Sequence, residues 1–198
     1  LIREWNPECP PLRGVVVVFP IRWAGQPDSV RWAAGLRDDL QALFRATRVR
    51  CPVFAVFTEM ETVPGFAEFL GRMPDPYKRG GRGFAVPPSR PFSSELIQAG
   101  LDWMTTWFQN WAINLMAEDL LNDAGNQRLF GLAQEFRRYR KRLRSLLEAA
   151  FSTHLEAEPV LFRGCYFTAT GADAADRAFV AAVLGGPHGR VHSEHTAT

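Results

Sequence analysis

The sequence predicts an α/β fold that is followed by an α-helical subdomain, and three observations support this. Two β-branched runs, at 14–19 and 53–57, flank a segment with helical periodicity. Residues 93–150 contain no proline and repeat apolar side chains at helical spacing. A further strand candidate follows at 160–168. Strand, helix and strand in this order are typical of a parallel βαβ unit.

The first unit spans about 45 residues. The run Gly-Val-Val-Val-Val-Phe at 14–19 has no polar alternation, so it predicts a strand that is buried on both faces, as in a parallel sheet. Asp28 or Ser29 can cap a helix, and 53–57 predicts a second buried strand after Cys51-Pro52. We expect a right-handed crossover between the two strands. The apolar stripe of the helix comprises Ala33, Leu36, Leu40, Leu43 and Phe44.

The middle of the chain changes character twice. A short helix is expected over 64–70, and a Gly- and Pro-rich loop over 71–92 encloses a possible short strand at 83–86. Two long helices then form an antiparallel pair. The first is expected to bury Leu96, Ala99, Trp103, Trp107, Trp111 and Leu115, and the second Phe130, Ala133, Phe136, Leu143, Leu147 and Phe151.

These patterns divide the chain into four parts. Residues 1–92 form an α/β part, 93–158 a helical extension, 159–184 a returning strand with a short helix at 173–184, and 185–198 a flexible tail. Because residue 1 is Leu rather than Met, we expect the sequence to be a piece of a longer chain.

The composition excludes several classes of protein. Of 198 residues 46% are hydrophobic and 22% charged, which is globular, and the net charge of +2 is too small to require nucleic acid. No apolar run is long enough to span a membrane, and no signal peptide is evident. The three cysteines are far apart and odd in number, so we expect a reducing compartment and no metal site.

The sequence contains no recognisable phosphate-binding loop for a nucleotide. The pattern GxxxxGK[ST] is absent, and neither lysine stands where it could supply one. Glu59 and Glu61 follow the strand at 53–57, at the end where ligands bind in open α/β sheets. They can accept hydrogen bonds from a base or serve as general acids or bases, or they can be solvated loop acids. We expect the last.

A basic stretch and a tryptophan ladder are the other candidate sites. Six cations fall in 137–144, and helical spacing places Arg137, Arg140, Lys141 and Arg144 on one face. This face can be solvated, or it can contact a protein partner or anionic membrane, whereas no recognition motif supports nucleic acid. The ladder at 103, 107 and 111 is expected to be core, and no histidine has a partner placed for metal binding or catalysis.

Five segments, in order, resemble the TssM (IcmF) family of type VI secretion proteins. They are Pro11–Val18, Cys51–Thr58, Glu61–Leu70, the helix from Gln134 to Phe151, and Arg163–Gly171. The last is the most specific, and it includes Arg163, Gly164, Tyr166 and Phe167.

The resemblance implies a partial three-layer, P-loop GTPase-like parallel sheet followed by a helical extension. It implies a domain at the cytoplasmic face of the bacterial inner membrane, anchored through parts of the parent chain that are not present here. Its partners would be other type VI secretion membrane-complex and baseplate proteins. The P-loop and the Mg²⁺-binding aspartate would lie upstream of Leu1, so GTP or ATP with Mg²⁺ is possible only for the parent chain.

One departure from the family weakens nucleotide binding. The base-reading motif Thr/Asn-Lys-x-Asp is replaced here by Thr58-Glu59-Met60-Glu61. Glu59 has the wrong charge to approach phosphate, and the side chain of Glu61 is one methylene too long for the usual bidentate hydrogen bonds to the nucleotide base. We therefore expect a scaffolding component without enzymatic activity or cofactor. The alternative is an NTPase domain whose P-loop lies upstream.

Overall fold

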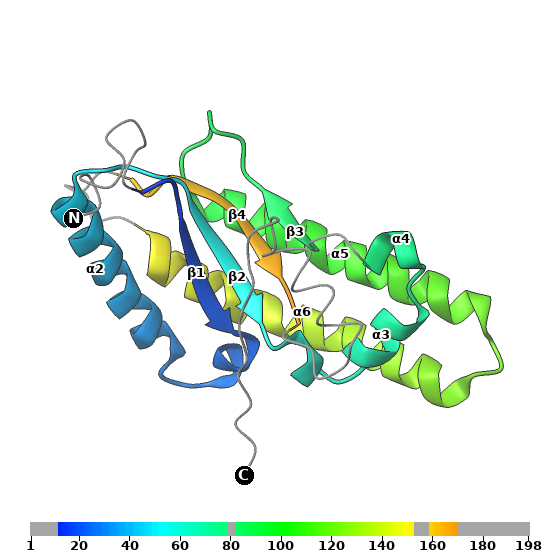
Figure 1. The fold of residues 1–198 in the computed structure, drawn as a ribbon. Coiled ribbons are helices and arrows are strands. Elements are labelled where there is room, and N and C mark those ends of the chain that lie inside the picture. The colour runs from blue at the N-terminus through cyan, green and yellow to red at the C-terminus, as the bar shows by residue number, and fades with distance from the viewer. Residues whose placement is uncertain (1–11, 79–81, 153–158, 170–198) are drawn as a thin grey trace, which may run out of the picture.

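The computed structural model describes residues 12–78, 82–152 and 159–169. Its sheet has the strand order β1-β2-β4-β3 (Figure 1). Strands β1 (Val15–Pro20), β2 (Val53–Thr58) and β4 (Phe162–Phe167) are parallel, and β3 (Arg82–Ala85) is antiparallel to β4. The sheet is therefore mixed rather than parallel throughout, because the short strand expected at 83–86 enters it in reverse beside β4.

The helices mostly follow the predicted segments. Asp28 occupies the N-cap position of helix α2, but its side chain makes no capping hydrogen bond, and Ser29 Oγ donates to the Gln26 carbonyl. At the other end of α2, the left-handed backbone of Arg48 lets its N–H donate to the Phe44 carbonyl. Three short helices, η1, η2 and α4, have no counterpart in the prediction. The bounds are η1 Ile21–Gly25, α2 Ser29–Thr47, η2 Met60–Thr62, α3 Phe66–Arg72, α4 Asp75–Lys78, α5 Ser94–Glu118 and α6 Asp123–Phe151.

Helix α6 covers one face of the sheet through aromatic rings. The ring centroid of Phe136 lies 5.7 Å from that of Phe167 in β4, and the ring centroid of Phe151 lies 5.1 Å from that of Phe162 in the same strand. The ring of Phe19, on the edge strand β1, also contacts Phe151, with 6.3 Å between the ring centroids. Helices α2 and α5 flank α6, so sheet and helices share one continuous core.

The opposite face of the sheet is open in the described part of the chain. Val16 and Val18 are 56% and 54% exposed, whereas Val17 between them is 4% exposed. The prediction that β1 is buried on both faces is therefore wrong, and the described elements form two layers rather than three. Steps from β1 to β2 and from β2 to β4 run in one direction across the sheet, so right-handed crossovers place both sets of helices on the same side.

Helices α5 and α6 form the expected antiparallel hairpin, but α5 is rotated from its expected phase (Figure 1). Trp103 is 54% exposed, and Trp107 and Trp111 are only partly buried, so the tryptophan ladder is not core. Ala99 is also exposed, and on α6 the predicted inward residue Phe130 is 58% exposed. The buried face of α5 comprises Ile97, Leu101, Met104, Thr105, Phe108, Ala112 and Leu115.

Several predictions fall outside the described residues. They are the short helix at 173–184, the tail at 185–198, Cys9 and the four histidines. Within the described ranges, no helix is both long and apolar enough to cross a bilayer.

Candidate functional site

The carboxyl ends of β1 and β2 lie side by side and carry the predicted acidic motif. Thr58 ends β2, and Glu59 caps the 3-10 helix η2 in a left-handed conformation with φ 63°. Thr62 donates a hydrogen bond from Oγ1 to the Glu59 carbonyl at 2.7 Å, which fixes this turn. Met60 is fully buried beneath it, and Glu61 lies within η2, half-buried.

An ion pair joins the two strand ends. Arg22, in the 3-10 helix η1 directly after β1, donates from an Nη atom to Glu59 Oε2 at 2.7 Å. The Arg22 side chain is 64% exposed and that of Glu59 23%. Glu59, which stands where the motif of the resembled family has lysine, therefore already binds a guanidinium from the neighbouring strand end.

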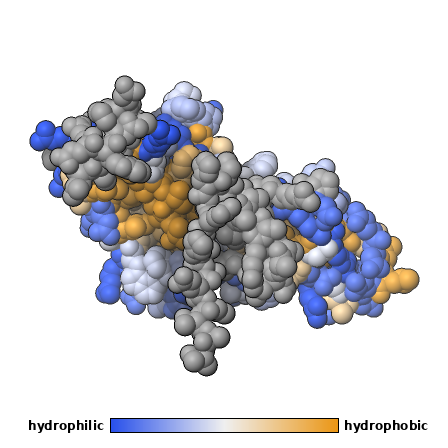
Figure 2. Space-filling view, in the orientation of Figure 1, coloured by the Kyte–Doolittle hydropathy of each residue, from blue (hydrophilic) through white to orange (hydrophobic). Residues whose placement is uncertain are grey.

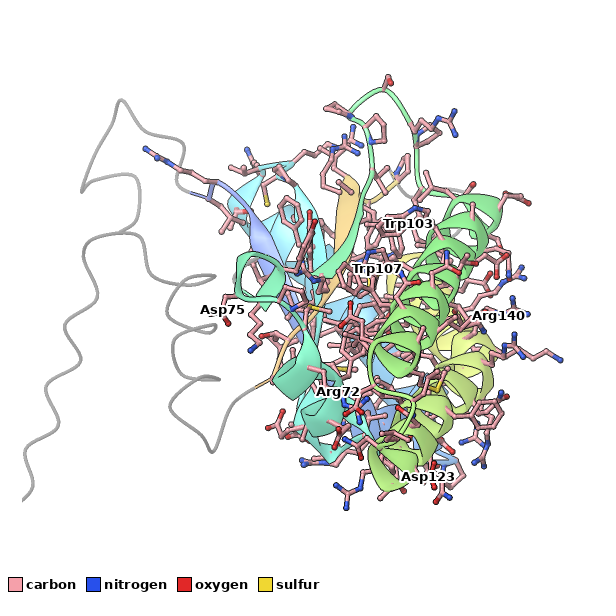
Figure 3. The ribbon with its side chains drawn as sticks, turned by 90° about the vertical axis from the view of Figure 1, so that its right-hand side faces the viewer. Arg72, Asp75, Trp103, Trp107, Asp123 and Arg140 are labelled. Atoms are coloured by element: carbon pink, nitrogen blue, oxygen red, sulfur yellow. The ribbon has the colours of Figure 1, made fainter. Side chains whose placement is uncertain are left out.

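Three of the four predicted contact residues on α6 are engaged within the protein. Arg137 donates to the side-chain oxygen of Gln109 on α5. Arg140 donates to Asp102 of α5 at 2.6 Å, and Arg144 donates to Glu148, to Gln98 and to Ser94, each at 2.7 Å (Figure 3). Burial opposes ionisation of Glu148, but hydrogen bonds from Ser94 and Arg144 outweigh it and lower the pKa of that carboxyl. These contacts lock α5 to α6.

Arg137 and Lys141 are the exposed members of the four. Lys141 lies beside Arg142, which donates to the Ala24 carbonyl at 3.2 Å. These two cations border an open pocket of about 390 Å³, here called the basic pocket. Its lining from the η1–α2 connection and from the two helices includes Ala24, Pro27, Ser29, Val30, Lys141 and Arg142.

The family-like segment in β4 has structural roles. Arg163 donates to the Phe162 carbonyl at 2.9 Å and to the Pro88 carbonyl at 3.2 Å, which ties the loop before α5 to the sheet. A side chain at Gly164 would meet the Phe84 carbonyl at 2.7 Å, so only glycine permits β3 to approach here. Tyr166 faces the open side of the sheet, and Phe167 is core.

A polar network fixes the distal end of the α5–α6 hairpin. Arg72 of α3 donates from Nε to Glu68 at 2.7 Å and from Nη1 to Asn126 Oδ1 at 2.9 Å and to the Leu115 carbonyl at 3.4 Å. Asn126 in turn donates to the Asp119 carbonyl at 2.9 Å. The network therefore joins α3 to both helices of the hairpin and to the loop between them.

This loop holds two leucines in solvent. Leu120 and Leu121 are 74% and 95% exposed. Their loop joins α5 to α6 at the end of the molecule away from α2 (Figure 1), and Figure 2 shows hydrophobic surface at that end. Asn122 caps α6 by accepting a hydrogen bond from the Gly125 N–H at 3.0 Å. We call Glu118, Asp119, Leu120, Leu121 and Asp123 the hairpin tip.

Comparison with known proteins identifies the family. Residues 8–197 match the IcmF-related N-terminal domain family. The chain belongs to this family. It is also 27% identical over 141 residues to the type VI secretion system component TssM1 of Pseudomonas aeruginosa. That match covers 69% of this chain and 13% of the relative, and no solved structure matches.

The family assignment confirms the resemblance that the sequence motifs indicated. In this IcmF-related domain the motif residues of β4 support the sheet. The acidic motif after β2 forms an ion pair. Among the described residues, no group of His, Cys, Asp and Glu side chains is arranged to hold a metal ion.

Sequence reasoning missed the hairpin tip and the basic pocket of this IcmF-related domain. The tip had a signal, since Leu120 and Leu121 follow two acids and precede a capping Asn. The pocket had none, because its two walls are separated by more than 100 residues in the chain.

Proposed function

We propose that this IcmF-related domain is a structural, partner-binding part of a TssM-like component of a type VI secretion system. The relative's name supports the secretion system, and the proposal includes a location at the cytoplasmic face of the inner membrane. Other membrane-complex and baseplate proteins of that system are its partners. In this proposal, the sheet and its crossover helix α2 are a fragment of a GTPase-like fold.

The observation that carries the proposal is the ion pair between Arg22 and Glu59. In a nucleotide-binding domain, the end of β2 presents a lysine stem and a short carboxylate to the base. Here Glu59 carries the opposite charge and is bound to Arg22, so a base would have to displace a guanidinium to reach it. This ion pair supports a scaffolding role over nucleotide hydrolysis.

The alternative is an NTPase domain that receives its phosphate loop from chain outside these 198 residues. The parallel order of β1, β2 and β4, with α2 as a crossover helix, favours this alternative, since open parallel sheets bind ligands at their carboxyl ends.

Calorimetric titration of GTP and ATP with Mg²⁺ separates the two functions. The titrations use the 198-residue chain and a longer version that includes the residues upstream. We expect no saturable binding to either. Binding below about 100 µM, a free energy near −5.5 kcal/mol, to the longer version would establish the NTPase alternative.

A matched pair of variants sharpens this test. Replacing Glu59→Lys and Glu61→Asp in the longer version restores the family's base-reading residues, and we expect it to leave nucleotide binding undetectable. Glu118→Lys, far from the strand ends, is the control for the change of charge. The loss of an exposed ion pair at Glu59 changes stability by less than about 1 kcal/mol, so the variant stays folded.

A further inference from the structure

The hairpin tip and the basic pocket are complementary in chemistry. The tip presents two exposed leucines among three acids, and none of these acids forms an ion pair within the described residues. The pocket presents the apolar side chains of Pro27 and Val30 beside two cations, and the rest of its lining is buried Ala24 with Gly25, Gln26, Ser29 and Ser145. Its volume of about 390 Å³ lies near the lower end of the range for ligand sites and suits a pair of aliphatic side chains.

We propose that copies of this domain associate head to tail, with the hairpin tip of one copy in the basic pocket of the next. This inference goes beyond the proposed function and holds whether or not the parent chain binds nucleotide. Leu120 and Leu121 enter the apolar part of the pocket. Glu118 and Asp119 then face Lys141 and Arg142.

The tip is preorganised for this contact. Two leucines in an unconstrained loop would turn inward, because burying apolar side chains is favourable. Here the Asp119 carbonyl is held by Asn126, and Asn126 is held by Arg72, so the loop keeps the leucines outward. Binding therefore requires little further ordering of this loop.

The geometry excludes contact within one copy. Lys141 lies 18 residues along α6 from Asp123, which is about 27 Å at 1.5 Å per residue. Figure 3 shows Asp123 at one end of the hairpin and Arg140 well away from it on the same helix. Since tip and pocket are different surfaces of each copy, the contact is heterologous and can repeat into a ring or a filament.

The charges also argue against an anionic membrane as the binding partner of the hairpin tip. Glu118, Asp119 and Asp123 would be repelled by anionic headgroups. Around the pocket Lys141 and Arg142 dominate, and Asp28, which is adjacent in sequence, is exposed and does not line it. A cation-bordered apolar pocket is the surface that this tip fits.

Sedimentation velocity of the 198-residue chain over a range of concentrations tests the proposal. We expect the average mass to rise with concentration at low salt and to fall as salt is added. The contact is smaller than a standard interface of about 1,200 Å², so weak association is expected. A chain that stays monomeric at every concentration overturns the proposal.

Variants identify the surfaces. Leu121→Ser should weaken association about tenfold or more, while Leu121→Met retains it. Both should keep the wild-type thermal midpoint, because the side chain is 95% exposed. Association that is unchanged in Leu121→Ser refutes the role of the tip.

A charge exchange completes the test. Glu118→Lys and Lys141→Glu should each weaken association, and a chain that carries both should recover it, because each copy then presents a basic tip and an acidic pocket. Lys141 has no ion pair among the described residues, so its replacement leaves the fold intact. Failure of the double variant to recover association overturns the assigned contact.

Discussion

Gly125 is the most sensitive test of the network that holds the hairpin together. It lies in the first turn of α6, where a side chain would collide with Arg72 Nη2, which is buried and has no hydrogen-bond partner. The same side chain would meet Glu68 Oε1 at 2.6 Å and Asn122 Oδ1 at 2.9 Å. Gly125→Ala therefore forces Arg72 out of its place.

The magnitude follows from the hydrogen bonds that Arg72 makes. Its side chain is 16% exposed and that of Glu68 19%, so solvent screens the pair only partly. Losing a charge-assisted hydrogen bond costs about 1.5–3 kcal/mol, and two are at risk. Alanine returns about 0.5–1 kcal/mol in helix propensity. The net loss of unfolding free energy is therefore about 2–5.5 kcal/mol.

Gly131→Ala is the matched control, two turns farther along α6. A side chain there would meet nothing within 4 Å, so this variant gains only propensity, about 0.5–1 kcal/mol. Thermal and urea unfolding should place the two variants on opposite sides of the wild type. In a chain of this size 1 kcal/mol shifts Tm by about 2–4 °C. Two alanine variants that raise Tm equally would refute the crowding of Arg72.

Three other predictions concern the effect on stability of core packing, of the contact between α5 and α6 (the hairpin seam), and of pH. Val17→Ala should cost about 2–3 kcal/mol of unfolding free energy and Val18→Ala less than about 0.5, since Val17 is 4% exposed and Val18 54%. Arg140→Glu should lower Tm because it places two acids together at the hairpin seam, whereas Lys141→Glu should not. The folded-state pKa of Glu148 lies below its unfolded value, so its contribution is present above about pH 4.3 and is lost as pH falls through the lower folded value. Glu148→Gln should accordingly flatten the loss of stability below about pH 4.3 in acid unfolding curves.

The sequence predicted where helices and strands lie better than it predicted which sides they bury. Helix α6 has one apolar stripe opposite a charged face, so most of its inward residues could be assigned. Helix α5 has a single charged residue, Asp102, between Glu95 and Glu118, and apolar side chains all round. Ring size therefore favoured the tryptophans, whereas the structure buries the neighbouring face of the helix, which includes Leu101, Phe108 and Ala112.

The open face of β1 was beyond sequence reasoning for a related reason. Four consecutive valines suit a strand that is covered on both sides, but they do not show that a second layer is present. Only the strand order reveals that the connecting helices lie on one side. The pairing of Arg22 with Glu59 was equally hidden, because it depends on two strand ends that are distant in the chain.

The internal pairs of the basic helix follow a rule that the sequence does contain. Ser94 with Glu148, Gln98 with Arg144, and Asp102 with Arg140 are each equally far from Leu121 along the chain. An antiparallel hairpin that turns at Leu121 brings together residues at equal distances from the turn, and the four-residue spacing keeps them on facing sides of the two helices. Once the turn is placed, Arg140 and Arg144 must face α5. Lys141 and Arg142 follow Arg140 by one and two residues, which rotates them by about 100° and 200° around the helix and directs them toward the basic pocket. The same stretch of cations thus serves two surfaces, because a helix separates neighbours in sequence onto different sides.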